Sequence, residues 1–346
     1  MFNVVTSASV KFTLGKEIGG EGKNSHTYLA HDDQLGADIV VKKVSKASLK
    51  DPAEYYKESR ALYASAHPNV VQVHYACEDG SDVFIAMPHY KKGSIRALLK
   101  TRYLTSREVA TLGCQILSGL HNIHSKGLVH FDIKSDNVLL SDRQEALITD
   151  FGLSKQLANG LASPDGIYGP HVPPEALSHT AFGPAYDIYQ TGLTLYAMAG
   201  GVRELSAQFD AYSVNGTFDE ARFKADLLGG RYPDRSALPP HIPAKLKKVI
   251  KRCLEVKPAD RFASALDAMN ALASVDGNEL DWQFSRSGTD RVWTKVADNA
   301  TLLFTVSSSG ASSLTKAIGT GSARKVTAGC HQKITALQIA SVLKSH

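Results

Sequence analysis

The segment that most constrains the fold of this chain is residues 129–140, in which an acid, a base and an amide stand at fixed offsets between two apolar flanks. These polar residues are Asp132, Lys134 and Asn137, and the tripeptide Asp-Phe-Gly follows at 150–152. One interpretation is an Asp- and Asn-rich surface turn between two strands. The other is a site in which these polar groups act together, and matches elsewhere in the chain favour it.

The order H-x-D-x-K-x-x-N followed by D-F-G resembles the catalytic loop and the metal-binding turn of protein kinases. In that family, catalysis is mostly positioning and charge neutralisation during transfer of the γ-phosphoryl group. The resemblance implies that Asp132 receives the substrate hydroxyl and accepts its proton, and that Lys134 lies beside the transferring group. It also implies that Asn137 and Asp150 hold Mg²⁺, which prefers oxygen ligands, so the expected cofactors are ATP and Mg²⁺.

A glycine-rich turn within residues 18–30 is similar to the phosphate-binding loop of the same family. Gly20 and Gly22 occupy the first two glycine positions, where the lack of a side chain lets backbone amides approach the nucleotide phosphates. Ser25 stands at the place of the third glycine, and Thr27 replaces the valine that covers the adenine. Taken alone, this turn is also typical of a plain β-hairpin.

Residues 39–42 resemble the strand whose lysine contacts the α- and β-phosphates of ATP. Lys42 and Lys43 compete for that position. Alternate side chains of a strand share a face, so Ile39 and Val41 lie on one face and Lys42 on the other. The alternation and the spacing from the glycine-rich turn both favour Lys42, while a solvated lysine on a strand is the simpler alternative.

A helix is predicted over residues 52–66, followed by H-P-N-V-V, which is similar to the segment after the αC helix of kinases. Glu58 lies ten residues before Pro68, where the family has the glutamate that pairs with the strand lysine. Glu54 is the competing acid one turn earlier. We prefer Glu58 because Leu62 then falls on the inward face of the helix.

Two strands are predicted at 71–77 and 83–87, and the segment after them resembles the hinge between kinase lobes. Met87 would be the gatekeeper of the nucleotide site. Pro88 has no N–H, but only a carbonyl is needed at its position, and Tyr90 supplies the donor two residues later.

Two long helices are predicted after the hinge segment. Thr105 and Glu108 form a capping-box pattern before an apolar stripe that Gly127 ends. Residues 188–202 are apolar and free of charge but contain Tyr, Gln, Thr and three Gly, which makes them too short and too polar to span a bilayer. They predict a buried core helix.

The activation segment of the family corresponds to residues 150–175, whose end resembles the A-P-E motif. The resemblance implies that Glu175 pairs with Arg261 and that Asp187 begins the central helix and braces the catalytic loop. It covers residues 11–275.

Three further positions depart from the family pattern. Phe131 replaces the arginine of H-R-D, which in the family receives an activation-loop phosphate. Ile167 stands where serine/threonine-specific members have a threonine, and His171 where an aromatic Tyr or Trp is usual. These departures concern the peptide site, because every charged group needed for Mg-ATP is present.

The composition, 43% hydrophobic and 21% charged in 346 residues, is ordinary for a globular protein and allows a two-lobed domain plus a small additional one. The N-terminus lacks the pattern of a secretory signal, so secretion is not expected. The four cysteines form no C-x-x-C pair, which favours reduced thiols in a cytoplasmic protein over disulfides or a zinc site.

The remaining C-terminal residues match no family that we recognise. Residues 282–346 carry eight Lys and Arg against two Asp and Glu, whereas the rest of the chain has 31 basic and 32 acidic residues. The elements predicted here are three strands, a Ser/Gly-rich loop and a terminal helix, at 282–284, 291–296, 301–306, 307–313 and 335–344 respectively. One hypothesis is a docking module for an acidic partner or nucleic acid, and the other is a structural cap with a solvated basic face.

The sequence therefore predicts an α+β, two-lobed fold similar to that of protein kinases, plus a small basic module of strands and a helix. The expected boundaries are an N-terminal lobe at 1–90, a C-terminal lobe at 91–275 and the module at 276–346. Lys134 resembles the serine/threonine class, so the expected substrates are Ser and Thr hydroxyls of proteins, with no membrane partner. A nucleotide-binding pseudokinase scaffold and a small-molecule phosphotransferase remain alternatives.

Overall fold

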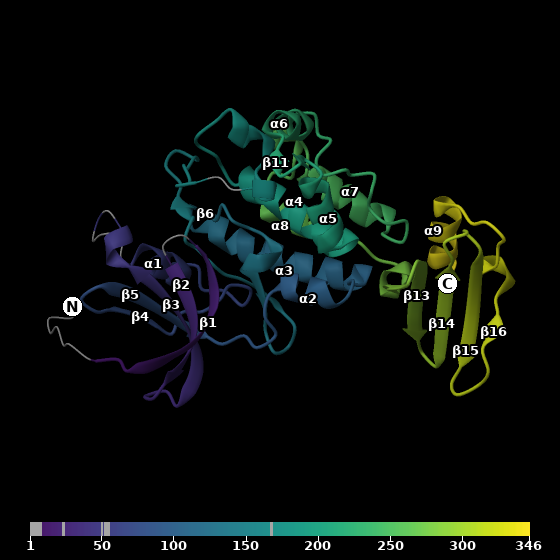
Figure 1. The fold of residues 1–346 in the computed structure, drawn as a ribbon, viewed down its shortest axis with the longest axis horizontal. Coiled ribbons are helices and arrows are strands. Elements are labelled where there is room, and N and C mark those ends of the chain that lie inside the picture. Colours follow the sequence, from purple (N-terminus) through teal and green to yellow (C-terminus); the bar gives the residue numbers. More distant parts are fainter. Residues whose placement is uncertain (1–8, 23–24, 50, 52–55, 167–168) are drawn as a thin grey trace.

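A five-stranded antiparallel sheet of order β1-β2-β3-β5-β4 forms the N-terminal lobe (Figure 1). The computed structural model describes residues 9–22, 25–49, 51, 56–166 and 169–346. The strands are β1 Phe12–Gly22, β2 Ser25–Asp32, β3 Ala37–Ser45, β4 Tyr75–Glu78 and β5 Asp82–Pro88.

The two faces of this sheet carry different side chains, as the alternation of β3 predicts. On one face, Ile39 and Val41 pack with Phe84 of β5 in a small apolar cluster. On the other face, Lys42 lies opposite Ile85, which belongs to the main core of the protein. The sheet thus presents the Lys42 ammonium group toward the rest of the molecule.

Helix α1, Lys57–Ala64, buries Leu62, as predicted. The predicted helix began at residue 52, but residues 52–55, including Glu54, lie outside the described residues. The strand predicted at 71–77 begins only at Tyr75, because the Val71 N–H donates to the Ile148 carbonyl of β8 at 2.9 Å and so does not join this sheet.

The C-terminal lobe is mostly helical. Helix α3, Ser106–Ser125, has the predicted capping box, since the Thr105 side chain accepts from the Glu108 amide and the Glu108 side chain accepts from the Thr105 amide. It ends before Gly127, whose φ of 71° suits glycine. Helix α4, Ala185–Gly200, is buried along almost its whole length, which confirms the predicted core helix although its ends differ by two to three residues.

The other helices and strands of this lobe surround α3 and α4 (Figure 1). The helices are α2 Ile95–Thr101, α5 Val202–Asp210, α6 Glu220–Leu228, α7 Ala244–Cys253 and α8 Ala265–Ala273. The short strands are β6 Leu128–Val129, β7 Val138–Leu140, β8 Ala146–Ile148, β9 Lys155–Gln156, β10 Ser213–Val214 and β11 Thr217–Phe218. Strands β7 and β8 pair antiparallel as a hairpin.

A second five-stranded antiparallel sheet and a helix form the C-terminal module, which lies beside the helical lobe in Figure 1. Its elements are β12 Gln283–Ser287, β13 Asp290–Ala297, β14 Ala300–Val306, β15 Ser312–Ile318, β16 Arg324–Lys325 and α9 Ala336–Ser345. The terminal helix and three strands were predicted. Strands β15 and β16 were not predicted. The predicted loop at 307–313 is wrong in its last two residues, which belong to β15. Strand β15 was missed because Leu314 is its one buried residue, so its sequence shows little alternation of apolar and polar side chains.

The predicted α+β, two-lobed fold is confirmed. Across the part of the chain that the structure describes, no helix combines the length and apolar character needed to cross a membrane.

Candidate active site

The hairpin of β7 and β8 sets the relative positions of Asn137 and Asp150. The two strands pair antiparallel, and just beyond them the Thr149 N–H donates to the Asn137 carbonyl at 3.0 Å. Asn137 therefore stands beside the residue that precedes Asp150. The hairpin brings the two predicted metal ligands to one end of a rigid element.

Asp132 lies within hydrogen-bond distance of both polar partners predicted from the loop. Lys134 Nζ donates to Asp132 Oδ2 at 3.0 Å, and Asn137 Nδ2 donates to the same oxygen at 2.7 Å. Asn137 Nδ2 also donates to the Asp132 carbonyl at 3.0 Å. The amide nitrogen of Asn137 is thus used within the loop, which leaves its Oδ1 as the ligand oxygen.

A buried carboxylate on α4 anchors this loop. Asp187 is fully buried and accepts from the backbone N–H groups of His130 and Phe131, each at 2.8 Å. The Nε2 atom of His124 lies 2.8 Å from the same carboxylate. These contacts are those expected of an acid that braces the catalytic loop. His124 was not singled out from the sequence.

A second residue of α4, Gln190, completes the anchor and was also missed. Its Oε1 accepts from the Ile133 N–H at 2.9 Å, and its Nε2 donates to the Phe131 carbonyl at 3.0 Å. Phe131 has a φ of 67°, a conformation that costs of order 1–3 kcal/mol in a residue other than glycine. Gln190 follows Asp187 by three residues, so one turn of a buried helix satisfies both polar backbone groups of this strained residue. A polar residue one turn after Asp187 in an apolar helix was the available signal.

His130 connects the loop to the Asp-Phe-Gly turn. The Asp132 N–H donates to His130 Nδ1 at 3.2 Å, so the ring carries its hydrogen on Nε2, which lies 3.1 Å from the Thr149 carbonyl. The ring also meets Phe151 edge to face at a centroid distance of 4.9 Å. Asp132 and Asp150 are therefore held by one continuous set of contacts.

Lys42 joins the sheet to the helix and to the Asp-Phe-Gly turn. Its Nζ lies 2.7 Å from Glu58 Oε1 and 2.8 Å from Asp150 Oδ1. The competing lysine, Lys43, points to the other side of β3 and pairs with Asp82 at 3.1 Å. Of the two lysines, Lys42 is the one that reaches the site, and Glu58 is the acid that meets it.

The charges of this group perturb one another. Burial alone would lower the pKa of Lys42, but the carboxylates of Glu58 and Asp150 outweigh it and raise the pKa above its usual value. The Lys42 ammonium is the main cause that lowers the pKa of Asp150 to about 2, whereas burial raises the pKa of Glu58. Asp150 is therefore ionised at neutral pH, as a metal-binding carboxylate must be.

The glycine-rich turn lies between β1 and β2. Gly20 and Gly22 belong to the end of β1, and Ser25 begins β2 opposite Gly22. Thr27 lies opposite Lys42 on the neighbouring strand, so both side chains point to the same face of the sheet. Residues 23–24, at the tip, lie outside the described residues.

The predicted hinge follows the last long strand of the sheet. Met87 is buried and lies opposite Val40, on the face that carries Lys42. Pro88 ends β5, and the Tyr90 carbonyl accepts from the Gly93 N–H at 3.0 Å in the turn that leads to α2. Tyr90 is half-buried, and its burial raises the pKa of its hydroxyl.

The end of the activation segment shows the expected ion pair. Arg261 contacts both carboxylate oxygens of Glu175 at 2.7 and 2.6 Å, and Arg261 is fully buried. His171 also lies in this segment, where burial lowers the pKa of its ring to about 4, so the ring is neutral at pH 7. Ile167 lies outside the described residues.

Phe131 sits in an aromatic cluster rather than at a charged site. Its buried ring meets Tyr186 at a centroid distance of 5.0 Å and Phe182 at 6.3 Å. On the activation segment nearby, the Lys155 ammonium forms an ion pair with Asp165. Lys155, on β9, therefore already has an anionic partner within the chain.

The donor set of the site fits a magnesium ion. Within residues 9–22, 25–49, 51, 56–166 and 169–346, no three His, Cys, Asp or Glu side chains gather as a self-contained metal site. Mg²⁺ does not require such a group, because it is commonly held by one or two carboxylates together with substrate phosphates. The Asp150 carboxylate and the free amide oxygen of Asn137 supply ligands of that kind.

Comparison with known proteins agrees with this geometry. The model of the protein kinase domain matches residues 12–273. Calcium-dependent protein kinase 9 of Arabidopsis thaliana is 31% identical over 273 residues, covering 76% of this chain and 48% of that protein. The serine/threonine-protein kinase STE20 of Saccharomyces cerevisiae is 27% identical over 253 residues, covering 72% of this chain and 26% of its own length.

The match to a bacterial relative covers more of the chain. A probable serine/threonine-protein kinase of Clostridium acetobutylicum is 26% identical over 310 residues, covering 85% of this chain and 43% of that protein. The chain thus spans about half or less of the length of these curated relatives. The matched kinase domain makes up most of the chain, and the chain belongs to the protein kinase family.

Proposed function

We propose that this chain is an ATP-dependent protein kinase that transfers the γ-phosphoryl group to Ser and Thr hydroxyls of proteins, its own included. The observation that carries the proposal is the contact of Lys42 Nζ with both Glu58 and Asp150, at 2.7 and 2.8 Å. It joins the sheet, α1 and the Asp-Phe-Gly turn into one charged assembly beside Asp132. A pseudokinase scaffold needs no such assembly, so this arrangement favours the active enzyme.

Asp132 is oriented to accept a proton. The hydrogen bonds that the structure gives its carboxylate fall on Oδ2, from Lys134 and Asn137. Oδ1 is then the oxygen left for the proton of a substrate hydroxyl, and two donors hold the carboxylate in place while it acts. Lys134 is close enough to stabilise negative charge on the transferring group.

ATP and Mg²⁺ are the proposed cofactors. Asn137 and Asp150 would hold Mg²⁺, which neutralises the charge of the phosphate oxygens when it is bound. Lys42 would bind the α- and β-phosphates, and Gly20 and Gly22 would offer backbone amides to the phosphates. Met87, Pro88, Tyr90, Ser25 and Thr27 are the residues proposed to surround the rest of the nucleotide.

Protein substrates are favoured over small molecules. The Glu175–Arg261 pair supports an ordered activation segment, which a small-molecule phosphotransferase does not need. Lys134, two residues after Asp132, favours the serine/threonine class. We also propose a cytoplasmic location, supported by the four cysteines, which are all unpaired.

The proposed activity is tested by incubating the full chain with γ-labelled ATP and a generic protein substrate, followed by phosphoamino-acid analysis. Label on serine and threonine is expected, together with autophosphorylation. Label confined to small-molecule hydroxyl compounds would favour the phosphotransferase. Nucleotide binding without any transfer would favour the scaffold.

The enzyme is expected to be active without phosphorylation of its activation segment. An arginine at position 131 would leave cations facing one another until a phosphate neutralised them, but Phe131 is packed in an aromatic cluster and Lys155 already pairs with Asp165. Phosphatase-treated and untreated enzyme should phosphorylate a protein substrate at the same initial rate. A large loss of rate on treatment, reproduced by Ser163→Ala, would contradict this expectation.

We propose that the C-terminal module at 276–346 is a structural cap of the kinase body, which comprises lobes at 1–90 and 91–275. Phe284 meets Tyr103 at a centroid distance of 4.7 Å and stacks on His241 at 4.9 Å, so an apolar side chain of the module is buried against the body. Arg107 of α3 also pairs with Asp281 at 2.5 and 2.8 Å. Docking of an acidic partner or nucleic acid is the second hypothesis, supported by the module's net charge.

Phe284→Ala tests the cap. Removing a buried phenylalanine costs about 3–5 kcal/mol, and we expect one cooperative unfolding transition at a lower Tm. Leu303→Ala is the matched control, because Leu303 is exposed on the open face of the same sheet. Two separate transitions in calorimetry, with the larger one unchanged, would show that the module is independent of the body.

A further inference from the structure

Helix α7 carries an unusual concentration of positive charge on its exposed face. It contains Lys245, Lys247, Lys248, Lys251 and Arg252 and no acidic residue. The apolar side chains between them, including Leu246 and Ile250, are buried in the main core. The basic face is therefore the face that the fold leaves open.

Part of this charge is unfavourable to the helix itself. Lys247 and Lys251 are four residues apart, as are Lys248 and Arg252, and like charges at this spacing repel. The first turn holds cations where the helix dipole favours anions. Burial lowers the pKa of Lys247, and the Lys251 charge lowers it further. Lys251 and Arg252 lie in the last turn, where the dipole favours cations, so the unfavourable part is the repulsion between like charges and the cations of the first turn. An external anion would relieve that repulsion.

Three of these cations form no ion pair within the described part of the chain. Lys245 pairs with Asp276, but none of the ion pairs found there includes Lys247, Lys248 or Lys251. Arg252 lies over the Phe262 ring at 4.4 Å, which holds its guanidinium in place.

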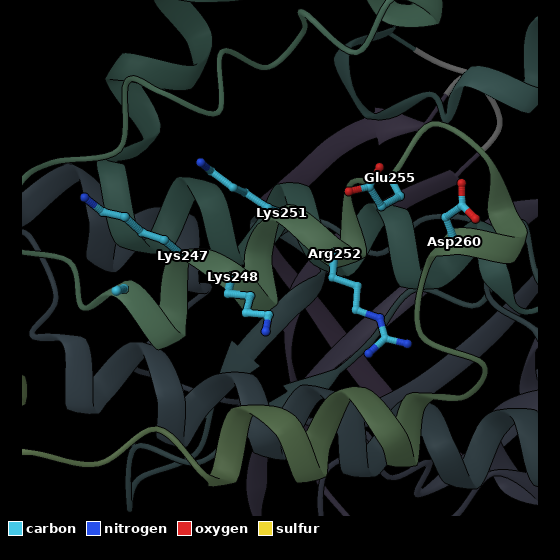
Figure 2. A pocket seen from close by; sticks show the side chains of 7 residues that line it. Lys247, Lys248, Lys251, Arg252, Glu255 and Asp260 are labelled. Atoms are coloured by element: carbon cyan, nitrogen blue, oxygen red, sulfur yellow. The ribbon is translucent and has the colours of Figure 1, made fainter.

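A hollow of about 710 Å³ follows this face, and Figure 2 shows its lining. Lys247, Lys248 and Lys251 lie toward one end, while Glu255 and Asp260 lie toward the other. The two ends of the hollow therefore carry opposite charges, with lysines at one end, acids at the other and Arg252 between them.

We propose that this hollow is a docking site for an acidic segment of a partner protein. Helix α7 is about 15 Å long, which matches four to five residues of extended peptide. A peptide can be acidic over that length and then turn neutral or basic beside Glu255 and Asp260. The proposal concerns binding alone and does not depend on the activity proposed above.

Two other polyanions fit the hollow less well. The lining contains no aromatic side chain on which nucleic-acid bases could stack, and the two acids would repel a continuing phosphate backbone. Helix α7 offers a membrane surface no apolar side chain for insertion, because its apolar face is buried in the protein.

The module is a weaker candidate for the same partner. Lys295 is buried and donates to the carbonyls of Asn278 and His346, each at 2.8 Å, and Arg286 lies 3.9 Å from Glu204. Part of its positive charge is thus already engaged within the protein.

The test measures binding of a fluorescein-labelled peptide of alternating Glu and Asp by fluorescence anisotropy, using the full chain at low and moderate salt. Combining Lys247→Gln, Lys248→Gln and Lys251→Gln should raise the Kd about tenfold or more, because three attractive charges are lost. Asp260→Asn should lower the Kd, because a repelling charge is removed.

The matched control removes three exposed cations from the module, by Lys316→Gln, Arg324→Gln and Lys325→Gln. This variant has the same net charge as the α7 variant and should bind the peptide as the parent does. Equal weakening in both variants, or no binding by the parent, would overturn the proposal. Tighter α7-dependent binding of single-stranded DNA or of phosphatidylserine vesicles would also overturn it, in favour of those partners.

Discussion

Asp132→Asn is expected to lower the rate of phosphoryl transfer by about 10²–10⁴-fold while leaving the affinity for Mg-ATP close to that of the parent. The amide has nearly the shape of the carboxylate, so the loop is retained, but it cannot take up the proton of a hydroxyl group. The contacts from Lys134 and Asn137 become poorer, yet neither the Lys42 contacts nor the Asp150 carboxylate is changed.

Asp150→Ala is the comparison that separates the two carboxylates. It removes a proposed metal ligand and one of the two anions that contact Lys42, so Mg-ATP binding itself should weaken. Isothermal titration calorimetry measures both affinities. Equal Mg-ATP affinities of the two variants would show that the roles of Asp132 and Asp150 are wrongly assigned.

Lys42→Met is expected to abolish most activity, with a loss of about 10²–10³-fold, because it removes the cation aimed at the phosphates. Lys43→Met should retain most of it, since Lys43 makes only a partly exposed pair with Asp82 and such pairs contribute about 0–1 kcal/mol. The measurement is the initial rate with radiolabelled ATP.

The Lys42 variant needs a control for folding. Its loss leaves the Glu58 carboxylate without its cation in a buried site, which also destabilises the protein. A double replacement, Lys42→Met with Glu58→Gln, relieves that penalty and should remain inactive. Recovery of activity in the double variant, or equal losses for Lys42→Met and Lys43→Met, would contradict the assignment.

Short motifs were sufficient to predict the main contacts of the site. The alternation of β3 identified the face of Lys42, and the spacing to Pro68 identified Glu58. The pairing of Glu175 with Arg261 joins positions 86 residues apart, and only the family resemblance could supply it. The apolar stripe and the capping box predicted α3, and the long run without charge predicted α4, because both signals are local in the sequence.

Other features depend on packing that leaves little trace in the sequence. The positive φ of Phe131 is imposed by bonds from Asp187 and Gln190, and nothing in the sequence of the loop signals it. Strand β15 has one buried apolar residue, so its pattern resembles that of a loop. The positive charge of α7 did not show in the net charge of the body, which is nearly neutral as a whole.

The central claim is that this chain transfers phosphate to protein hydroxyls by means of Asp132. The most direct measurement is mass spectrometry of a dephosphorylated cell extract incubated with ¹⁸O-labelled γ-phosphate ATP and either the parent chain or Asp132→Asn. We predict heavy phosphate on serine and threonine residues with the parent chain and its absence with the variant. Heavy phosphate on the same residues with both proteins, or on none with either, would contradict the claim.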